Sequence, residues 1–420
     1  MFNLIRFTTK ITKTLLIFGV LSYSHLLLAG GFYLQEVGTP SSIGTAGTAR
    51  TTNNVGAETA WGNPAGMTGL EKTTMLNGAQ VVIPTNEFDS DIAEGGGSDG
   101  GNAGNIAAIP SFYFVKPVSD DVSLGFSVVA PLGGGFDYGN DFVGRYAVQE
   151  ISLQGVALSP SIGYKVNEDF SIGAGVSVLY TIFDYDLAIN NPGPVADGQV
   201  KIEDADDWGY QFFLGMQYQL NEKTRLGLVY RSEADVDLSG DIEINDSLLP
   251  VQLTGNANVG WDNPQLLEAG LSYKVNDNLT IFAQADWEDW SEFSYNSFEI
   301  SGDGGFTTVA AIDRDFKDTY RFGVGMAYKK EDGIFLLGTS YDSSPVSDSN
   351  RTLDLPLDEQ IRITGGYIVQ RENKWDYGLS ASLVYFGDGK VDQTSQGVRT
   401  KGEFDKNWIL FLGGNIRHEF

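Results

Sequence analysis

The 420-residue chain contains no cysteine and only two histidines. The absence of cysteine excludes a disulfide-stapled scaffold and any chemistry that needs a thiolate. His25 lies in an N-terminal segment that we expect to be removed, and His418 is third from the end of the chain. No Ser-His-Asp triad, Cys-His pair or histidine-based metal site can be assembled, so we expect no enzyme activity and no cofactor.

Basic residues are also scarce, with 27 Lys and Arg against 55 Asp and Glu. So acidic a chain repels a phosphate backbone, which argues against nucleic-acid binding. The acidic, glycine-rich stretch 89–101 offers oxygen ligands but lacks the spacing of an EF-hand loop, so we predict no metal site there.

No apolar run reaches the length of about 20 residues that a membrane-spanning helix needs. The longest run, residues 14–28, is interrupted by polar residues, preceded by three basic residues and followed by Ala29 and two glycines. This is the layout of a secretory signal peptide, which we place at residues 1–29. The exported chain retains 24 of the 27 basic residues and all 55 acidic ones.

Residues 171–182, SIGAGVSVLYTI, show the two-residue period of a half-buried strand. One face carries Ile172, Ala174, Val176, Val178, Tyr180 and Ile182, and small or polar residues fall on the other, with Leu179 as the exception. Soluble sandwiches and membrane barrels both contain such strands, so the connections must separate the two classes.

Six short polar turns alternate with seven longer connections. The turns are residues 116–121, 166–169, 220–223, 275–278, 329–333 and 370–374, and the longer connections lie near 86–104, 132–146, 190–199, 244–263, 301–316, 343–358 and 388–403. Seven hairpins joined by six tight turns make fourteen strands, and this sorting of loops by length is typical of outer-membrane barrels. We predict an all-β, 14-stranded antiparallel transmembrane barrel over residues 73–420, in the outer membrane of a Gram-negative bacterium.

The last strand fits this prediction. One face carries Trp408, Leu410, Leu412, Gly414, Ile416, His418 and Phe420, and the chain stops on that terminal aromatic. An outward aromatic at this position suits the interfacial girdle of a barrel. We therefore expect His418 to point outward and Phe420 to act as an assembly signal for the barrel assembly machinery.

Residues 30–72 precede the strands and carry little charge but several apolar anchors, including Phe32, Leu34 and Trp61. A disordered tail would not need these anchors. GFYL (31–34), IGTAGTA (43–49) and AETAWGNPAGMTGL (57–70) resemble the N-terminal hatch of the FadL family of outer-membrane transporters for long-chain fatty acids and other hydrophobic compounds. Further segments resemble the family in the same order, at residues 159–180, 227–244, 285–293 and 341–367.

The resemblance implies a barrel plugged by residues 30–72. Phe32, Leu34, Asn63, Pro64 and Ala65 would form the hatch and gate, with Pro64 fixing a rigid corner. Trp61 would be a packing anchor, or else a ligand contact. The implied route is capture by extracellular loops, transfer to a pocket beside the hatch, and lateral exit into the membrane.

Strand parity and composition suggest further candidate residues. On the ninth strand Phe282 and Trp290 would face the pocket, opposite Ile281, Ala283, Ala285 and Trp287. Gly125, Pro131, Gly133 and Gly134 would distort the third strand and open the wall there, or merely begin an extracellular loop.

Fatty-acid carriers of the family hold the carboxylate with basic residues, one of them in the fifth strand. The matching stretch here has Asp184 and Asp186 instead, although Arg145, Arg231 or Arg321 could substitute. We therefore expect neutral hydrophobic molecules, such as hydrocarbons, to be carried as well as fatty acids. We expect a monomer in contact with outer-membrane lipid. Two other functions stay open: a structural or adhesive barrel acting through its loops, and a general water-filled porin.

Overall fold

The computed structural model describes residues 34–420 except 247, 249–251, 303–304, 306 and 372–373. The predicted signal peptide, residues 1–29, and Phe32 lie outside the described residues.

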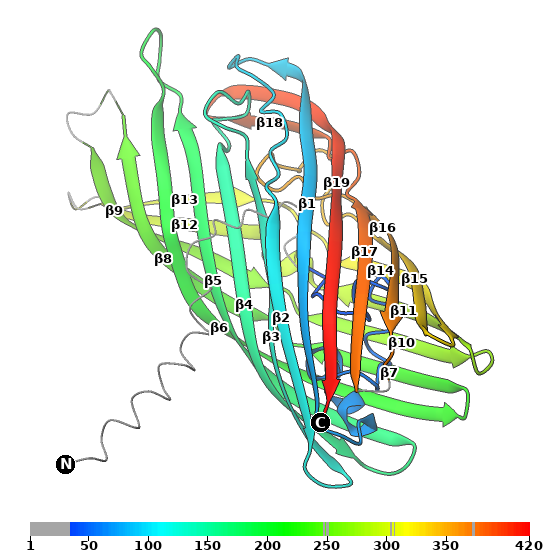
Figure 1. Cartoon of the computed structure of the whole chain (residues 1–420). Coiled ribbons are helices and arrows are strands. Elements are labelled where there is room, and N and C mark those ends of the chain that lie inside the picture. Colours follow the sequence, from blue (N-terminus) through cyan, green and yellow to red (C-terminus); the bar gives the residue numbers. More distant parts are fainter. Residues whose placement is uncertain (1–33, 247, 249–251, 303–304, 306, 372–373) are drawn as a thin grey trace, which may run out of the picture.

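Within the described residues, fourteen strands form a closed antiparallel ring (Figure 1). They are β1 (Thr74–Ala93), β2 (Ala107–Pro117), β3 (Val122–Asp137), β4 (Glu150–Lys165), β5 (Phe170–Ile189), β6 (Gly198–Asn221), β7 (Thr224–Arg231), β10 (Leu266–Lys274), β11 (Leu279–Glu288), β14 (Thr319–Lys330), β15 (Gly333–Asp342), β16 (Gln360–Val369), β17 (Trp375–Tyr385) and β19 (Val398–Glu419). The last strand pairs with the first, from Glu419 opposite Thr74 to Thr400 opposite Ala93. The predicted 14-stranded barrel is confirmed.

Five further strands extend the wall at the long-loop end: β8 (Ala234–Asn245), β9 (Leu253–Asn263), β12 (Tyr295–Gly302), β13 (Thr307–Asp313) and β18 (Val391–Ser395). They lie in or beside the predicted longer connections near 244–263, 301–316 and 388–403, which join ring strands as expected but contain strands of their own. In β8 the inward Val236 and Leu238 are buried, whereas the outward Asp235 and Asp237 are exposed. A strand beyond the membrane has no need of an apolar outer face, and its sequence therefore resembles that of a loop.

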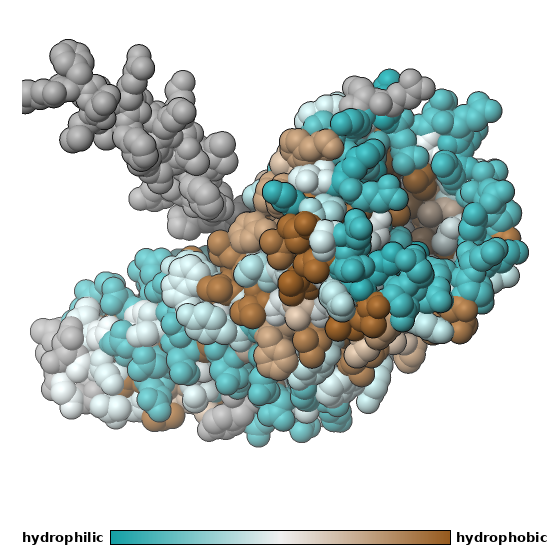
Figure 2. Space-filling model, turned by 90° about the horizontal axis from the view of Figure 1, so that it is seen from below, coloured by the Kyte–Doolittle hydropathy of each residue, from teal (hydrophilic) through white to brown (hydrophobic). Residues whose placement is uncertain are grey.

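The outer wall of the ring is apolar where it would meet lipid. On β6, Tyr210, Phe212 and Leu214 are 67%, 50% and 47% exposed, whereas the intervening Gln211 and Phe213 are buried. On β5 Ile172 and Val176 are exposed and Leu179 is buried, which confirms the predicted faces. In Figure 2 apolar side chains gather across the middle of the molecule, flanked by hydrophilic regions. No helix in the described part of the chain is long and apolar enough to cross a membrane.

The N-terminal segment, residues 34–72, lies within the ring (Figure 1). It contains the short helix α2 (Thr59–Gly62) and the 3-10 helix η1 (Pro64–Gly69), and almost all of its residues up to Met67 are buried. The wall approaches it through inward-facing glycines, at each of which an added Cβ would collide with the segment: Gly78, Gly125, Gly163, Gly173, Gly215, Gly227, Gly270, Gly325, Gly338 and Gly413. Because these glycines lie on ten different strands, the segment is seated against most of the circumference.

The end of the chain meets the start of the barrel. The backbone N–H of Phe420 donates to the carbonyl of Thr73 (2.9 Å), and the side chain of Phe420 is exposed. His418 stacks on Trp375 (4.1 Å between ring centroids) and lies edge-on to Phe420. These three rings form an aromatic cluster at the short-turn end of the wall, where an interfacial girdle would lie.

Candidate functional site

The long-loop half of the lumen is filled by one apolar cluster, which we call the upper chamber. It unites inward residues of the wall with residues of six connections between ring strands, and its centre is aromatic. Trp261 and Phe293 are 4.6 Å apart, Trp290 and Phe293 5.7 Å, and Phe293 and Phe316 5.7 Å, measured between ring centroids. A lumen lined in this way is unsuited to a polar diffusion pore, which needs charged or polar rings.

The connection between β15 and β16, residues 343–359, folds into the upper chamber as a lid loop. Its Val346, Leu353, Leu355 and Leu357 are buried members of the chamber cluster. A buried ion pair between Arg314 and Asp354 (2.7 Å) anchors it.

Other polar contacts hold the lid loop in the same position. Arg351 pairs with Asp358 (3.0 Å) within the loop. Tyr138, on the connection after β3, donates its hydroxyl to the Leu353 carbonyl (2.9 Å). The apolar side chains of this loop are therefore directed toward the lumen.

Below the upper chamber lies a layer of charged side chains, the charged belt. It comprises Arg50, Arg321, Arg362, Glu36, Glu268, Asp286, Glu288 and Asp342. Arg321 donates from Nε to Asp286 (2.6 Å), Arg362 donates from Nε to Glu36 (3.2 Å), and Arg50 pairs with Glu268. Because Arg50 and Glu36 lie on the N-terminal segment, the belt ties the segment to the wall.

The belt is joined to the upper chamber through Trp290. The Trp290 indole donates to Glu288 (2.8 Å), and Glu288 accepts a second hydrogen bond from Gln35 of the N-terminal segment (3.2 Å). These three residues line a cavity of about 30 Å³ together with Arg362 and Leu357. Removing one partner of such a buried pair would be costly, because it leaves the other charge uncompensated.

Phe282 and Trp290 both face inward, and Ile281, Ala283 and Ala285 face outward. The structure does not bring the two aromatics together. Trp290 lies above the belt in the upper chamber, on the 3-10 helix η2 (Trp290–Ser294). Phe282 lies below the belt, in a separate cavity.

The structure also corrects the placement of Asp184 and Asp186. Their neighbours Phe183 and Tyr185 point into the chamber, so the two acids face outward, and Asp186 pairs with Lys201 (3.2 Å). Neither carboxylate lies where a ligand head group in the chamber would be.

The wall is interrupted at β3. Strand β2 pairs with β3 only between Phe112–Val128 and Pro117–Ser123, so β3 has no β2 partner beyond Val128 among the described residues. The register of β3 against β4 shifts between Val129 and Leu132, at Ala130 and Pro131. Proline cannot donate a ladder hydrogen bond, which explains why the irregularity falls there.

The three candidate glycines pair regularly with β4 and are not the source of the irregularity. Gly125 lies opposite Ser161 below the interruption, where its missing side chain makes room for Met67. Gly133 and Gly134 lie opposite Gln154 and Leu153 on the stretch that lacks a β2 partner.

Asn63 and Pro64 form a fixed corner in the N-terminal segment. The Asn63 amide donates to the carbonyls of Thr51 (2.7 Å) and Met216 (3.0 Å), and its oxygen accepts from the Ala65 N–H (3.1 Å). Asn63 therefore begins the 3-10 helix and fastens it to β6.

Trp61 packs next to this corner. The Arg231 guanidinium lies 4.1 Å from the Trp61 ring centroid, and the Phe213 ring centroid is 6.2 Å away. Trp61 is 2% exposed, and its neighbours make it a packing anchor in this structure.

The comparisons with known proteins agree on one family. Residues 20–412 match the model of the outer membrane protein transport protein family, OMPP1/FadL/TodX. The chain belongs to this family. The long-chain fatty acid transport protein of Escherichia coli is similar at 26% identity, over 98% of this chain and 99% of that one.

Solved structures show the same fold. The structure of a FadL homologue from Pseudomonas aeruginosa has a TM-score of 0.84 at 20% identity, over 93% of this chain and 100% of that one. The toluene transporter TbuX of Ralstonia pickettii has a TM-score of 0.72 at 20% identity, over 92% and 99%. The chain is thus an outer-membrane transport protein of the FadL family, and its relatives are transporters rather than enzymes.

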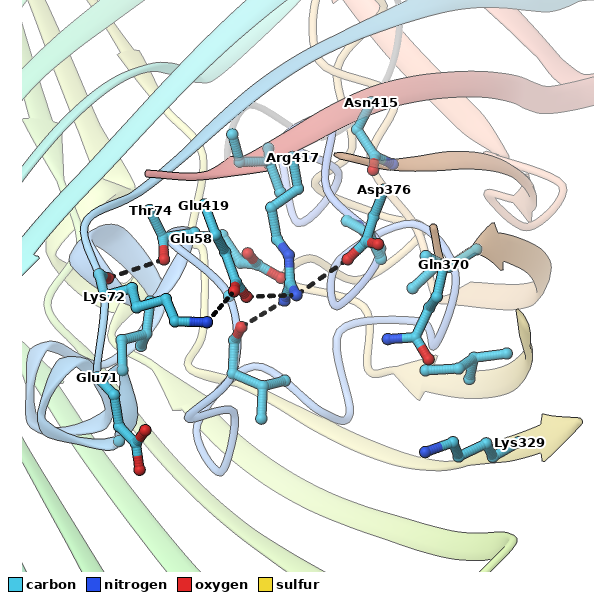
Figure 3. Close-up of a pocket in the computed structure, with 18 residues that line it drawn as sticks. Glu58, Glu71, Lys72, Thr74, Lys329, Gln370, Asp376, Asn415, Arg417 and Glu419 are labelled. Carbon is cyan, nitrogen blue, oxygen red and sulfur yellow. Dashed lines mark hydrogen bonds and ion pairs between the residues drawn. The ribbon is translucent and has the colours of Figure 1, made fainter. Parts of the chain in front are cut away.

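In an outer-membrane protein the short turns face the periplasm. On that side the N-terminal segment and the wall enclose a cavity of about 440 Å³ (Figure 3). Arg417 on β19 crosses it, donating to the Val55 carbonyl of the segment (2.6 Å) and pairing with Asp376 and Glu419 (2.9 Å each). Glu58, 8% exposed, lines the same cavity, and its burial raises the pKa of this carboxyl above the ordinary value.

Several of these features escaped the sequence analysis. The belt residues lie on the N-terminal segment and on several strands, and their partners range from 20 residues away, as for Arg362 and Asp342, to 326 residues away, as for Arg362 and Glu36. An inward-facing charge within a strand, as at Arg321 on β14 and Arg362 on β16, is the signal that points to them, because a lone charge in a barrel wall must find a partner in the lumen.

Proposed function

We propose that this protein takes up long-chain fatty acids and other hydrophobic molecules through the outer membrane. The apolar cluster that fills the long-loop half of the lumen, to which the wall and the inward-folded lid loop both contribute, carries this proposal. Burial is worth about 0.8 kcal/mol per methylene, so a 16-carbon chain gains on the order of 10 kcal/mol before ordering costs. A porin would not need such a lining, and an adhesive barrel would direct its loop side chains outward.

The N-terminal segment acts as the hatch in this proposal. A ligand that has displaced the chamber side chains can leave the lumen only if the segment or its contacts with the wall move. The interrupted stretch of β3 provides the lateral exit, with Pro131, Gly133 and Gly134 at its edge. Leu34 covers that edge at the start of the described segment.

The ligand is recognised chiefly by its apolar part. Each belt arginine already pairs with a carboxylate, and the belt holds five carboxylates against three guanidinium groups. Arg145 pairs with Asp197 (2.8 Å) in the extracellular loops, and Arg231 is engaged by Trp61 and Phe213. The carboxylate of a ligand would have to displace one of these partners to pair with an arginine. Recognition in this proposal therefore does not require a carboxylate, and neutral hydrophobic molecules are carried as well.

Uptake by a hatch variant tests the function. Replacing Asn63 and Pro64 with alanine removes one hydrogen bond to the wall, at Met216, and two within the segment, at Thr51 and Ala65, and it frees the corner. Each lost bond costs about 1 kcal/mol. We expect a heat-modifiable barrel with altered uptake of radiolabelled oleate and of toluene. Unchanged uptake of both compounds would contradict a gating role for the segment.

The C-terminal residue Phe420 concerns assembly into the outer membrane rather than uptake. We propose that Phe420 serves recognition by the barrel assembly machinery and that the protein functions as a monomer in outer-membrane lipid. Deleting Phe420 is then expected to lower the amount of barrel in the outer membrane while uptake per folded molecule is unchanged, and normal membrane levels would count against this role.

A further inference from the structure

A second cavity, of about 340 Å³, lies on the periplasmic side of the charged belt, between the N-terminal segment and the wall. It adjoins the cavity of Figure 3, with which it shares Pro40, Val55, Glu58, Ile334 and Ile368. Its volume falls within the range of about 300–1,000 Å³ that small-molecule pockets occupy. We call it the lower cavity.

One side of the lower cavity is apolar. Inward-facing side chains from four neighbouring strands line it: Phe282 on β11, Ala327 on β14, Ile334 and Leu336 on β15, and Ile368 on β16. The strand register joins them, because Leu336 lies opposite Ala327 and Ile334 opposite Ile368. These side chains form a continuous apolar surface across the inner wall.

The opposite side is cationic. The cavity is lined on this side by Lys223, just before β7, by Arg225 on β7 and by Lys274 on β10. The Arg225 Nε donates to Gln219 (2.9 Å), and its Nη1 approaches the Thr52 carbonyl at 3.4 Å. No carboxylate of the described residues lies within ion-pair distance of Arg225, in contrast to the arginines of the charged belt.

The register of three adjacent strands places the cationic and apolar sides in one row. Arg225 lies opposite Ser272, and Ser272 lies opposite Phe282. Two strand spacings of about 4.8 Å separate the arginine from the phenylalanine. From β7 to β16 the wall spans five strand spacings, or about 24 Å along its curve. The register places Thr364 of β16 level with Arg225, and Ile368 lies four residues further along that strand. A long acyl chain with its head at Arg225 would therefore run obliquely across the wall.

Other charged groups at the cavity leave the cationic end net positive. Glu222 lies in the exposed turn beside Lys223, and Lys274 pairs with Asp277 (2.9 Å), a turn residue whose side chain is 95% exposed. Exposed pairs of this kind are weak and do not compete strongly with a ligand. Glu58 is held on the segment by Ser41 and Asn53, and its raised pKa favours the neutral form.

We propose that the lower cavity is a binding site for an amphiphile with one carboxylate, distinct from the upper chamber. The carboxylate pairs with Arg225, supported by Lys223 and Lys274, and the acyl chain lies along Phe282, Leu336 and Ile368. The inference rests on the proposed function in that an acid reaches this site by passing the belt instead of leaving laterally at β3. The lower cavity thus binds the carboxylate head group, whereas the upper chamber contacts only the apolar tail.

Fluorescence quenching by a mid-chain dibrominated fatty acid and by the dibrominated alcohol of equal length tests this site. In the purified full-length protein, Phe282→Trp places a reporter in the lower cavity, and the signal of the unaltered protein is subtracted. We expect the acid to quench this reporter at concentrations at least tenfold lower than the alcohol. Arg225→Gln in the same background is expected to abolish that preference.

A matched control is Lys330→Gln, which removes a cation at the same end of the barrel that lines neither cavity. It is expected to retain the preference for the acid. Equal quenching by acid and alcohol, or a preference that survives Arg225→Gln, would overturn the lower site. Heat-modifiability on gels verifies that each variant is a folded barrel.

Binding in the upper chamber is measured separately through the fluorescence of Trp290. This contribution is the difference between the fluorescence of the unaltered protein and that of the Trp290→Phe variant. Quenching of Trp290 by both compounds with no acid preference at the Phe282→Trp reporter would reject the lower site and leave the proposed transport function intact. Absence of quenching at Trp290 would count against the chamber whatever happens below the belt.

Discussion

The backbone N–H of Leu34 donates a 2.7 Å hydrogen bond to the carbonyl of Pro131. Pro131 lies at the irregularity of β3, where β2 no longer pairs with that strand. Leu34 also packs against Val82 and Ile109 in a small apolar cluster of the wall. One residue of the N-terminal segment thus occupies the position from which an adjacent strand is missing.

A disulfide between these two residues is the first prediction. The direct hydrogen bond brings the two backbones close enough for a Leu34→Cys, Pro131→Cys pair to be bridged, and the native chain has no cysteine to compete. We expect oxidation to abolish uptake of hydrophobic substrates and reduction to restore it. Leu34→Cys alone serves as the control. Full uptake by the oxidised double variant would show that the segment need not leave the gap.

The architecture of the wall was predictable because it follows from two local signals. Alternation along β5 and the sorting of connections by length are properties of neighbouring residues, and both survive in the structure. The inward fold of the lid loop was not predictable, because Val346 and Leu353 lie in an irregular segment without a period. The belt depends on partners such as Glu36 and Arg362, which are 326 residues apart. The two-residue alternation of the strand predicts that Phe282 and Trp290 face the lumen. It carries no information on the charged residues that lie between them.

The second prediction concerns the lid loop. Asp354 is buried, which alone would raise the pKa of its carboxyl, but the Arg314 charge and hydrogen bonds from Arg314 and Thr352 outweigh burial and lower it. Replacing Asp354 with asparagine leaves the buried Arg314 charge without its partner, a change that costs about 3–5 kcal/mol. We expect faster hydrogen exchange throughout residues 343–359 while the wall strands keep their protection.

The pH dependence of the lid follows from the sign of that shift. A carboxyl whose pKa is lowered in the folded state stabilises that state above its unfolded pKa of about 3.9 and loses the effect as the pH falls through the lower, folded value. The unaltered lid is therefore expected to show constant protection from neutral pH down to about 4, once intrinsic exchange rates are corrected for. A loss of protection between pH 7 and 5 would contradict the assignment of the Arg314–Asp354 pair as the anchor.

The third prediction has the opposite sign and concerns Glu58. Burial raises the pKa of this carboxyl, so its protonated form favours the seated position of the N-terminal segment. The contribution is fully present below the unfolded pKa and is lost as the pH rises through the folded value. We expect exchange in residues 53–70, corrected for intrinsic rates, to increase from pH 4.5 to 8.

Glu58→Gln provides the comparison for that measurement. The amide keeps an oxygen to accept from Ser41 and Asn53 and carries no charge to be buried. Exchange in the variant is expected to be slow and independent of pH over the same range. If the variant instead follows the pH profile of the unaltered protein, another group controls the seating of the segment.

The last prediction is the head-group preference of the upper chamber. The apolar side chains around Trp261, Phe293 and Phe316 can bury a tail, and the belt arginines below them are already paired. A carboxylate at this level would approach five belt carboxylates in a medium of low dielectric constant, where repulsion costs several kcal/mol unless a proton is taken up. We expect a mid-chain dibrominated fatty acid and the dibrominated alcohol of equal length to quench Trp290 with affinities that agree within about tenfold, or 1.4 kcal/mol, at neutral pH and matched salt. A stronger preference for the acid, if it is lost in Arg362→Gln, would show that Arg362 gives up Glu36 or Asp342 to hold the ligand.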